Sequence, residues 1–274
     1  MSEFQYYEFQ AIDRPLTRPE MAELRKYSTR ARITPTSFVN DYQWGNFKGD
    51  QDAWVERRFD AFLYLANWGT HILSIRLTAG SIRATTARAY CRGGNAAART
   101  RSGQVILTLV SETDEGDELC ETEGRLSSMI PVRSELAHGD LRALYLGWLL
   151  RLQSGELRDD DIEPPVPPGL GQLSGALQAM AEFLRIDEAL LAIAAEHSPP
   201  ATRRVLKRSD IDRRVHELPL RVKEKALADC IAGKPSALQR LQDAVLEPTP
   251  SGSVSGGAPR RTAEQIIRAA GLSV

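Results

Sequence analysis

The first 78 residues alternate between strand-like and helix-like patterns of apolar positions. Residues 4–12 (FQYYEFQAI) are rich in aromatic side chains, which favours a strand. Pro15 ends this strand because proline cannot continue a strand ladder. Thr17 followed by Glu20 is a capping box, in which both side chains satisfy backbone amides at the start of a helix that runs to about Tyr27.

The next part of the chain predicts two short strands, a helix and a further strand. Asp50 or Asp52 is expected to cap the helix, which continues to about Asn67 because the apolar residues keep near-helical spacing. The expected strands are 31–34, 37–44 and 71–77. The resulting order of strand, helix, strand, strand, helix and strand is the split β-α-β pattern of ferredoxin-like folds.

Aromatic residues are concentrated in this same region. Fourteen of the eighteen lie before residue 69, so the best-defined core is expected there. The sequence therefore predicts the α+β class, with a ferredoxin-like core over residues 1–78 and an extended sheet, followed by a mostly α-helical C-terminal region.

The middle of the chain is expected to extend and cover this sheet. Residues 81–90 suit a short helix, and residues 104–110 form a strand that is apolar on both faces, which places it inside a sheet. After Asp140, apolar side chains recur at helical spacing over 141–152, and the apolar surface they form extends nearly all round the helix. This helix is therefore expected to be buried.

An acidic and then proline-rich stretch marks a predicted domain boundary. Its composition favours extended polyproline II and a semi-rigid spacer. Helices are expected beyond it, and glycine and serine after residue 248 are typical of a flexible linker before a short terminal helix. The predicted parts are an α+β domain at 1–158, a spacer at 159–172, a helical region at 173–247, and the linker with its terminal helix at 248–274.

Composition restricts the class of protein. The hydrophobic and charged fractions, 42% and 26%, are those of an ordinary globular protein, and a net charge of −1 argues against a wholly basic nucleic-acid clamp. Cys91, Cys120 and Cys230 lack metal-site spacing and are interpreted as reduced thiols. The chain shows no secretory signal and no apolar run long enough to span a membrane, so we expect a cytoplasmic protein without membrane contact.

Charge is segregated around residues 104–110. Six arginines and no acid occur in residues 61–111, whereas seven acids and no base occur in residues 112–123. A seven-residue strand spans roughly 23 Å, well beyond a Debye length of about 8 Å, so the two groups cannot neutralise each other along it. The arginines are Arg76, Arg83, Arg88, Arg92, Arg99 and Arg101. The candidate acidic surface comprises Glu112, Asp114, Glu115, Asp117 and Glu118.

Three interpretations of this segregation remain open. Both groups can be solvated loops that serve solubility alone. The arginines can bind phosphate, since their planar forks suit phosphate oxygens. Alternatively, the basic end of one copy can meet the acidic end of another copy or of a different protein, in a head-to-tail contact.

The sequence carries no strong catalytic motif. It lacks a phosphate-binding loop, a dinucleotide-binding glycine pattern, a nucleophile elbow and a zinc-protease helix. Four scattered histidines are interpreted as structural, with a dyad of Cys91 and His71 as a weak alternative. Carboxylates at Glu8, Asp13, Asp41 and Asp50 match no metal motif. We therefore predict no catalytic residue, no metal and no cofactor, and lean against an enzyme.

One group of aromatic residues has two interpretations. Alternation along a strand puts Tyr6 on the face it shares with Phe4 and Glu8, and it puts Tyr42 and Trp44 on one face of a second strand. These aromatics are core if the middle segment covers the sheet. On an open sheet, Tyr6, Tyr42 and Trp44 form a platform on which nucleic-acid bases stack.

Several segments resemble a family of uncharacterised bacterial proteins, over most of residues 1–200. The resemblance implies a bacterial cytosolic origin and carries no activity or functional residue. The matching segments are YYEFQAIDRPLT (6–17), ITPTSFVNDYQWGNFKGD (33–50), FLYLANWGT (62–70), LRALYLGWLL (141–150) and PPVPPGLGQLS (164–174).

Binding features outnumber chemical ones, so we predict a non-enzymatic interaction protein, a scaffold or subunit of a bacterial cytoplasmic complex. A protein partner or a second copy is the expected ligand. The alternative is a nucleic-acid-binding component that uses the arginine-rich segment and the aromatic sheet face.

Overall fold

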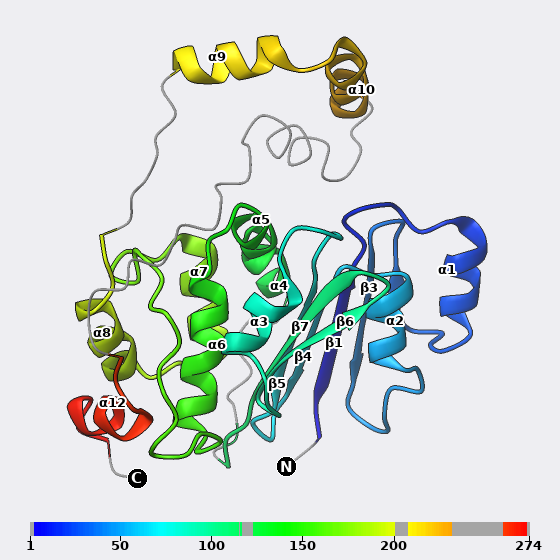
Figure 1. Cartoon of the computed structure of the whole chain (residues 1–274). Helices are drawn as coiled ribbons and strands as arrows, with labels where there is room; N and C mark the ends of the chain where they lie inside the picture. Colours follow the sequence, from blue (N-terminus) through cyan, green and yellow to red (C-terminus); the bar gives the residue numbers. More distant parts are fainter. Residues whose placement is uncertain (1–2, 115, 117–122, 201–207, 232–259, 273–274) are drawn as a thin grey trace.

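A seven-stranded sheet in which every neighbouring pair is antiparallel forms the centre of the molecule (Figure 1). The computed structural model describes residues 3–114, 116, 123–200, 208–231 and 260–272. The strand order is β2-β3-β1-β4-β5-β7-β6. The strands are β1 (Gln5–Gln10), β2 (Arg32–Ile33), β3 (Ser37–Tyr42), β4 (Ala61–Ala66), β5 (His71–Arg76), β6 (Ala96–Arg101) and β7 (Gln104–Ser111).

Helices cover both faces of this sheet. On one side lie α1 (Arg18–Arg25) and α2 (Gln51–Arg57) (Figure 1). The opposite side carries α3 (Ala84–Tyr90), α4 (Arg125–Met129), α5 (Pro131–Ala137), α6 (Arg142–Gln153), α7 (Gly175–Phe183), α8 (Glu188–Glu196) and α12 (Ala263–Ala269). Two further helices, α9 (Arg208–Glu217) and α10 (Leu220–Ile231), stand clear of the sheet and its covering helices.

The predicted α+β class is confirmed, with the sheet toward the N-terminus and most helices toward the C-terminus. The ferredoxin-like pattern is not confirmed, because the sheet is larger: three further strands, β5, β7 and β6, continue it beyond β4.

The helix expected to continue to Asn67 was wrong in its second half. Helix α2 ends at Arg57, and residues 61–66 form β4, which pairs with β1 and β5. All six residues of β4 are buried, so the segment is apolar on both faces and its periodicity cannot distinguish a strand from a buried helix. Strand β6 was not predicted.

Caps at the helix starts follow the sequence closely. The predicted capping box of Thr17 and Glu20 is present at α1. Of the two residues expected to cap α2, Asp50 is the cap, and its side chain accepts a hydrogen bond from the backbone amide of Ala53 at 2.9 Å. These contacts involve residues within three positions of one another, which is why the sequence alone predicts them.

The face covered by α1 and α2 is filled by aromatic rings. Phe9 stacks on Phe62 with ring centroids 4.4 Å apart, and Trp54 meets Phe38 edge to face at 5.0 Å. This cluster confirms that the N-terminal aromatic residues build a core.

Helix α6 forms the centre of the opposite layer. Nine of its twelve residues are buried, as the sequence predicted for a helix that is apolar nearly all round. Gly147 lies against the sheet, where an added Cβ would be 2.7 Å from the sulfur of Cys91 and 3.0 Å from Leu109. Glycine is therefore required for the close approach of this helix.

The spacer predicted at 159–172 lies against this layer. Glu163 and Leu170 are 3% and 2% exposed, and one hydrophobic cluster contains residues from both sides of the spacer. The cluster also includes Ala263 and Ile266 of α12, so the C-terminal end packs beside α8.

Candidate interaction surfaces

Two arginines of the predicted site lie on the edge strand β6 and pair with carboxylates of α2. Arg99 grips Asp52 with both terminal nitrogens, at 2.8 and 2.9 Å, and Arg101 contacts Glu56 at 3.3 Å. The hydrogen bonds with Asp52 raise the pKa of Arg99. Asp52 and Glu56 thus neutralise Arg99 and Arg101, two arginines that the sequence suggested as binding sites for phosphate or for a partner protein.

The other four arginines are distributed between the interior and the surface. Arg76 is inside a buried ion network described below. Arg88 donates to the carbonyl of Ala98 at 3.3 Å and to Thr100 at 3.2 Å, which places its guanidinium beside β6. Arg83 and Arg92 are exposed.

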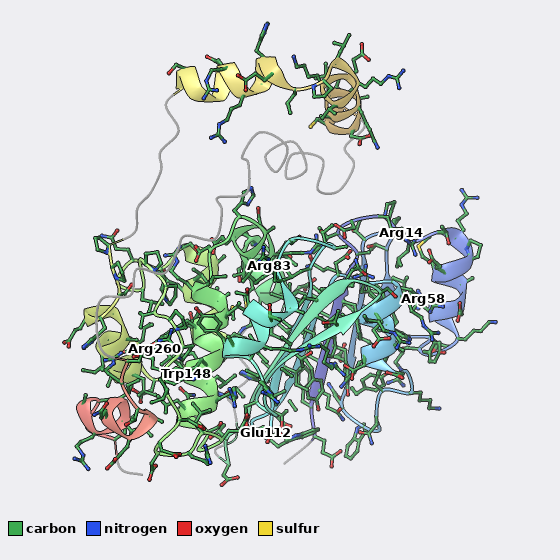
Figure 2. All side chains as sticks on the ribbon, viewed as in Figure 1. Arg14, Arg58, Arg83, Glu112, Trp148 and Arg260 are labelled. Carbon is green, nitrogen blue, oxygen red and sulfur yellow. The ribbon has the colours of Figure 1, made fainter. Side chains whose placement is uncertain are left out.

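The acidic part of the predicted surface is described only in part. Glu112 and Asp114 are exposed, whereas Glu115, Asp117 and Glu118 lie outside the described residues. Figure 2 shows Glu112 far from Arg83 across the body of the molecule. In the described part of the chain, Arg99 and Arg101 therefore use Asp52 and Glu56 and not the acids that follow β7.

The three aromatic residues of the alternative platform do not share a face. Gln5 lies opposite Tyr42 in the ladder, so Tyr42 and Tyr7 lie on one side of the sheet and Tyr6 lies on the other. Tyr6 is 5% exposed, whereas Trp44 is 80% exposed beyond the end of β3. Packing of helices on both sides explains why no open aromatic face is formed.

A buried ion network joins Asp60, directly before β4, to Arg76 of β5 and Arg133 of α5. Asp60, 1% exposed, receives Arg76 at 2.6 Å and two backbone amides, at 2.6 and 2.9 Å. Arg133 grips Asp13 at 2.7 and 2.9 Å and donates to the carbonyl of Arg76 at 2.7 Å. Burial alone would raise the pKa of Asp13, but the hydrogen bonds and charge of Arg133 lower it. The network holds the sheet to α5.

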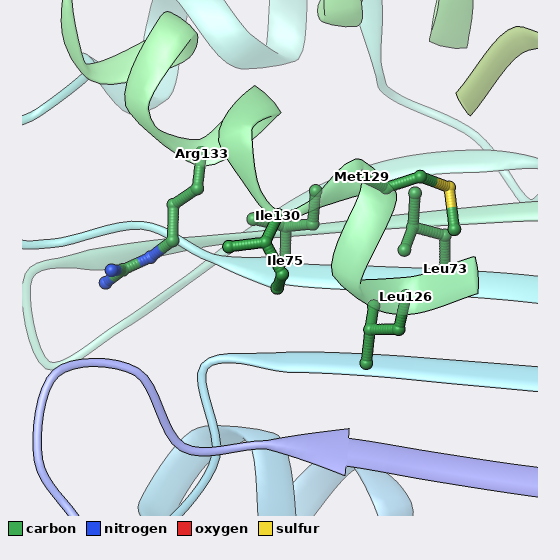
Figure 3. A pocket seen from close by; sticks show the side chains of 6 residues that line it. All are labelled: Leu73, Ile75, Leu126, Met129, Ile130 and Arg133. Atoms are coloured by element: carbon green, nitrogen blue, oxygen red, sulfur yellow. The ribbon is translucent and has the colours of Figure 1, made fainter. Parts of the chain in front are cut away.

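Beside this network lies a small apolar pocket that has no space for a water molecule. Figure 3 shows the guanidinium of Arg133 pointing away from the other side chains that line it. Those side chains are Leu73, Ile75, Leu126, Met129 and Ile130. The pocket is a packing defect between α4 and the sheet, with no volume for a ligand.

The groups considered for catalysis are engaged in structural contacts. Burial raises the pKa of the Cys91 thiol to about 12, and its sulfur lies 3.5 Å from the carbonyl of Leu144. A buried thiol of this kind is unreactive. His71 contacts the carbonyl of Phe183 at 2.7 Å through Nδ1 and Arg185 at 3.0 Å through Nε2.

The four candidate metal carboxylates lie in different environments. Glu8 bonds to Tyr6 and Gln10, Asp13 to Arg133, and Asp50 to the first turn of α2, whereas Asp41 is exposed. Among the described residues, no group of three or more possible metal ligands comes together. None of the described helices is both long and apolar enough to cross a lipid bilayer.

A second polar cluster lies where the C-terminal segment meets the spacer. Tyr145 of α6 donates to Glu163, and Arg261 grips the same carboxylate at 2.7 and 3.0 Å. Burial, then the charge and hydrogen bond of Glu163, raise the pKa of Tyr145. Burial alone would lower the pKa of Arg261, but Glu163 raises it. The carboxylate of Glu163 is therefore held between two donors, the Tyr145 hydroxyl and the Arg261 guanidinium.

An apolar stripe on α10 was missed by the sequence reasoning. Leu220, Leu227 and Ile231 are 68%, 63% and 79% exposed, and in Figure 2 the side chains of α9 and α10 stand away from the body. The sequence did contain a signal for this stripe, because spacings of seven and then four residues place the three side chains on one face of a helix. It was overlooked because exposure cannot be read from spacing.

Comparison with protein-family models, with curated proteins and with solved structures gives no match to this chain.

Proposed function

We propose that this chain is a non-enzymatic interaction protein, a subunit of a bacterial cytoplasmic complex, and that it binds its partner protein through α10. The observation that carries the proposal is the exposed apolar stripe of Leu220, Leu227 and Ile231. Large apolar side chains gathered on an exposed surface are typical of protein-binding sites.

Helix geometry places the three side chains on one line. Seven residues fall about 20° short of two turns and eleven pass three turns by about 20°, so Leu220, Leu227 and Ile231 lie within about 40° of one another. This is the spacing of anchors with which a helix enters an apolar groove. Each buried side chain contributes about 1.5–3 kcal/mol.

The charges of α10 indicate the chemistry of the partner. Arg221 and Lys223 lie on either side of the stripe, about 100° and 60° from Leu220, and Glu224 lies beside it at about 40°, while Asp229 is buried. A net positive rim favours an apolar groove that is bordered by acidic side chains. The partner we infer is therefore a different protein with such a groove.

Site-specific cross-linking tests the proposal. A photo-reactive phenylalanine replaces Leu227 in one form and Arg18, an exposed residue of α1, in a control form. We expect the Leu227 form to cross-link to one different protein in cells and the Arg18 form not to. Cross-links only within the chain, or only to a second copy, would overturn a separate partner.

A binding measurement with the purified partner completes the test. The double variant Leu220→Gln and Leu227→Gln should weaken binding about 100-fold or more, because each lost anchor contributes about 1.4 kcal/mol or more, which is a factor of about ten. The matched control, Val222→Gln, makes the same kind of change on the opposite side of α10, about 200° from Leu220, where Val222 is 38% exposed, and binding should stay within about threefold. Equal binding by the double variant and by Val222→Gln would contradict the proposal.

The nucleic-acid alternative is favoured by one observation, the grouping of arginines at the edge strand. Arg88 reaches Thr100, which lies between Arg99 and Arg101 on β6. If these arginines bind phosphate, affinity for RNA or DNA should fall steeply between 50 and 200 mM salt, and Arg88→Gln should reduce the salt dependence. No binding at low salt would eliminate the alternative.

A further inference from the structure

The C-terminal segment, residues 260–272, is held to the body by contacts of three kinds. Arg261 supplies the first, gripping buried Glu163 and also reaching the carbonyl of Ile193 at 3.2 Å and Nδ1 of His197 at 2.9 Å. A guanidinium fork on a carboxylate that is 3% exposed gives both charge and geometric selectivity. The site therefore recognises an arginine at this position.

Backbone pairing supplies the second kind of contact. The amide of Glu163 donates to Arg261 at 2.9 Å and the amide of Ala263 donates to Asp161 at 2.9 Å, so Ile162 and Thr262 face each other in a short antiparallel bridge. The body therefore binds part of the segment as a short strand that pairs with residues 161–163.

Apolar burial supplies the third. Thr262 and Gln265 form a capping box that starts α12, and Ala263 and Ile266 are 1% and 0% exposed beside α8. An arginine, a capped helix start and a buried isoleucine together make a complete peptide ligand. All of these features lie within six residues of sequence, 261–266.

We propose that this is a peptide-docking site, and that it accepts residues 260–272 of a second copy of the chain in exchange for its own segment. Fifty-nine residues, 201–259, separate the segment from the end of the body at Pro200. A segment exchanged between copies makes the same contacts as it makes in its own molecule, so exchange costs little contact free energy. This inference does not depend on the proposed function.

The bridge between Ile162 and Thr262 provides a direct test. The two hydrogen bonds flank this pair, so it is a non-hydrogen-bonded pair, in which side chains are close enough for a disulfide. One full-length chain carries Ile162→Cys and another carries Thr262→Cys, both with Cys120→Ser and Cys230→Ser. The two are mixed, incubated and oxidised with oxidised glutathione.

We expect a mixed disulfide that joins the two chains, mapped to residues 162 and 262 by mass spectrometry. Adding Arg261→Ala to the Thr262→Cys chain should reduce the yield at least tenfold, whereas Arg268→Ala should not. Arg268 is the matched control because it lies on α12 and pairs only at the surface, with Glu264. Equal yields with both variants would attribute the disulfide to random collision and overturn the proposal.

A single chain with both cysteines serves as the reference for geometry. It should form the disulfide within one molecule, because the bridge already brings the two positions together. A disulfide in this chain with none in the mixture would confine the segment to its own molecule. No disulfide in either sample would remove the docking site itself. Both results would overturn exchange.

Discussion

At the scale of single residues, buried charges are stabilised by partners that lie far away in sequence. Asp60 depends on Arg76 and Glu163 depends on Arg261, and each carboxylate is less than 5% exposed. Removing one partner of such a pair leaves an uncompensated charge and costs about 3–5 kcal/mol. These residues determine which segments stay together.

Glu8 differs because, among the residues that the structure describes, its carboxylate is hydrogen-bonded to the neutral side chains of Tyr6 and Gln10 and forms no ion pair. Burial raises its pKa, opposed by hydrogen bonds from Gln10 and Tyr6. A carboxyl whose folded pKa is raised contributes stability below its ordinary pKa and loses it as pH rises through the raised value. The free energy of unfolding of Glu8→Gln minus that of the natural chain should therefore increase from pH 4 to pH 7.

Urea denaturation at several pH values measures this difference. Ser37→Ala is the control, since Ser37 is a neutral residue on the neighbouring strand β3 and the change adds or removes no titratable group. Its difference from the natural chain should stay nearly constant over the same range. A flat profile for Glu8→Gln would show that burial does not perturb this carboxyl.

At the scale of elements, close contact between α6 and the sheet depends on one glycine. In Gly147→Ala the new methyl group meets Cys91 and Leu109 at 3.0 Å or less. Overpacking costs about 1–3 kcal/mol, which outweighs the gain of about 1 kcal/mol in helix propensity. We expect a lower melting temperature by calorimetry.

Gly175→Ala is the matched control for this element. Gly175 begins α7, and an added Cβ there would have no heavy atom within 4 Å. This variant should leave the melting temperature unchanged or slightly higher. If Gly147→Ala behaved in the same way, helix α6 would have room to move away from the sheet.

At the scale of the whole molecule, α10 and the body should be energetically separate. Leu220 and Leu227 are exposed, so the double change to Gln should alter the free energy of unfolding of the body by less than about 0.5 kcal/mol per residue. Leu144→Ala, inside α6 and 0% exposed, should cost about 2–5 kcal/mol. Chemical denaturation followed by Trp fluorescence compares them.

A large loss of stability in the Leu220 and Leu227 variant would mean that the stripe packs within the molecule. The proposed partner surface would then be a covered one. Together with the binding measurement, this comparison distinguishes a stripe that binds a partner protein from a stripe that packs within the molecule and stabilises the fold.

The sequence by itself determined the local features of this protein. The capping box of Thr17 and Glu20, the cap at Asp50 and the all-round burial of α6 follow from residues within a few turns, whose contacts depend on backbone geometry alone. It also determined the α+β class, because patterns of period two and of helical period are both present.

Only the tertiary structure decided which distant residues meet. Arg99 pairs with Asp52 across 47 positions, and Arg261 pairs with Glu163 across 98. Residues 61–66 form a strand because their backbone groups pair with β1 on one side and β5 on the other. Tyr6 and Tyr42 lie on opposite faces of the sheet because the register places Tyr42 opposite Gln5. The physical reason is that such pairs are selected by packing of the whole chain, whereas a sequence pattern reports only neighbours.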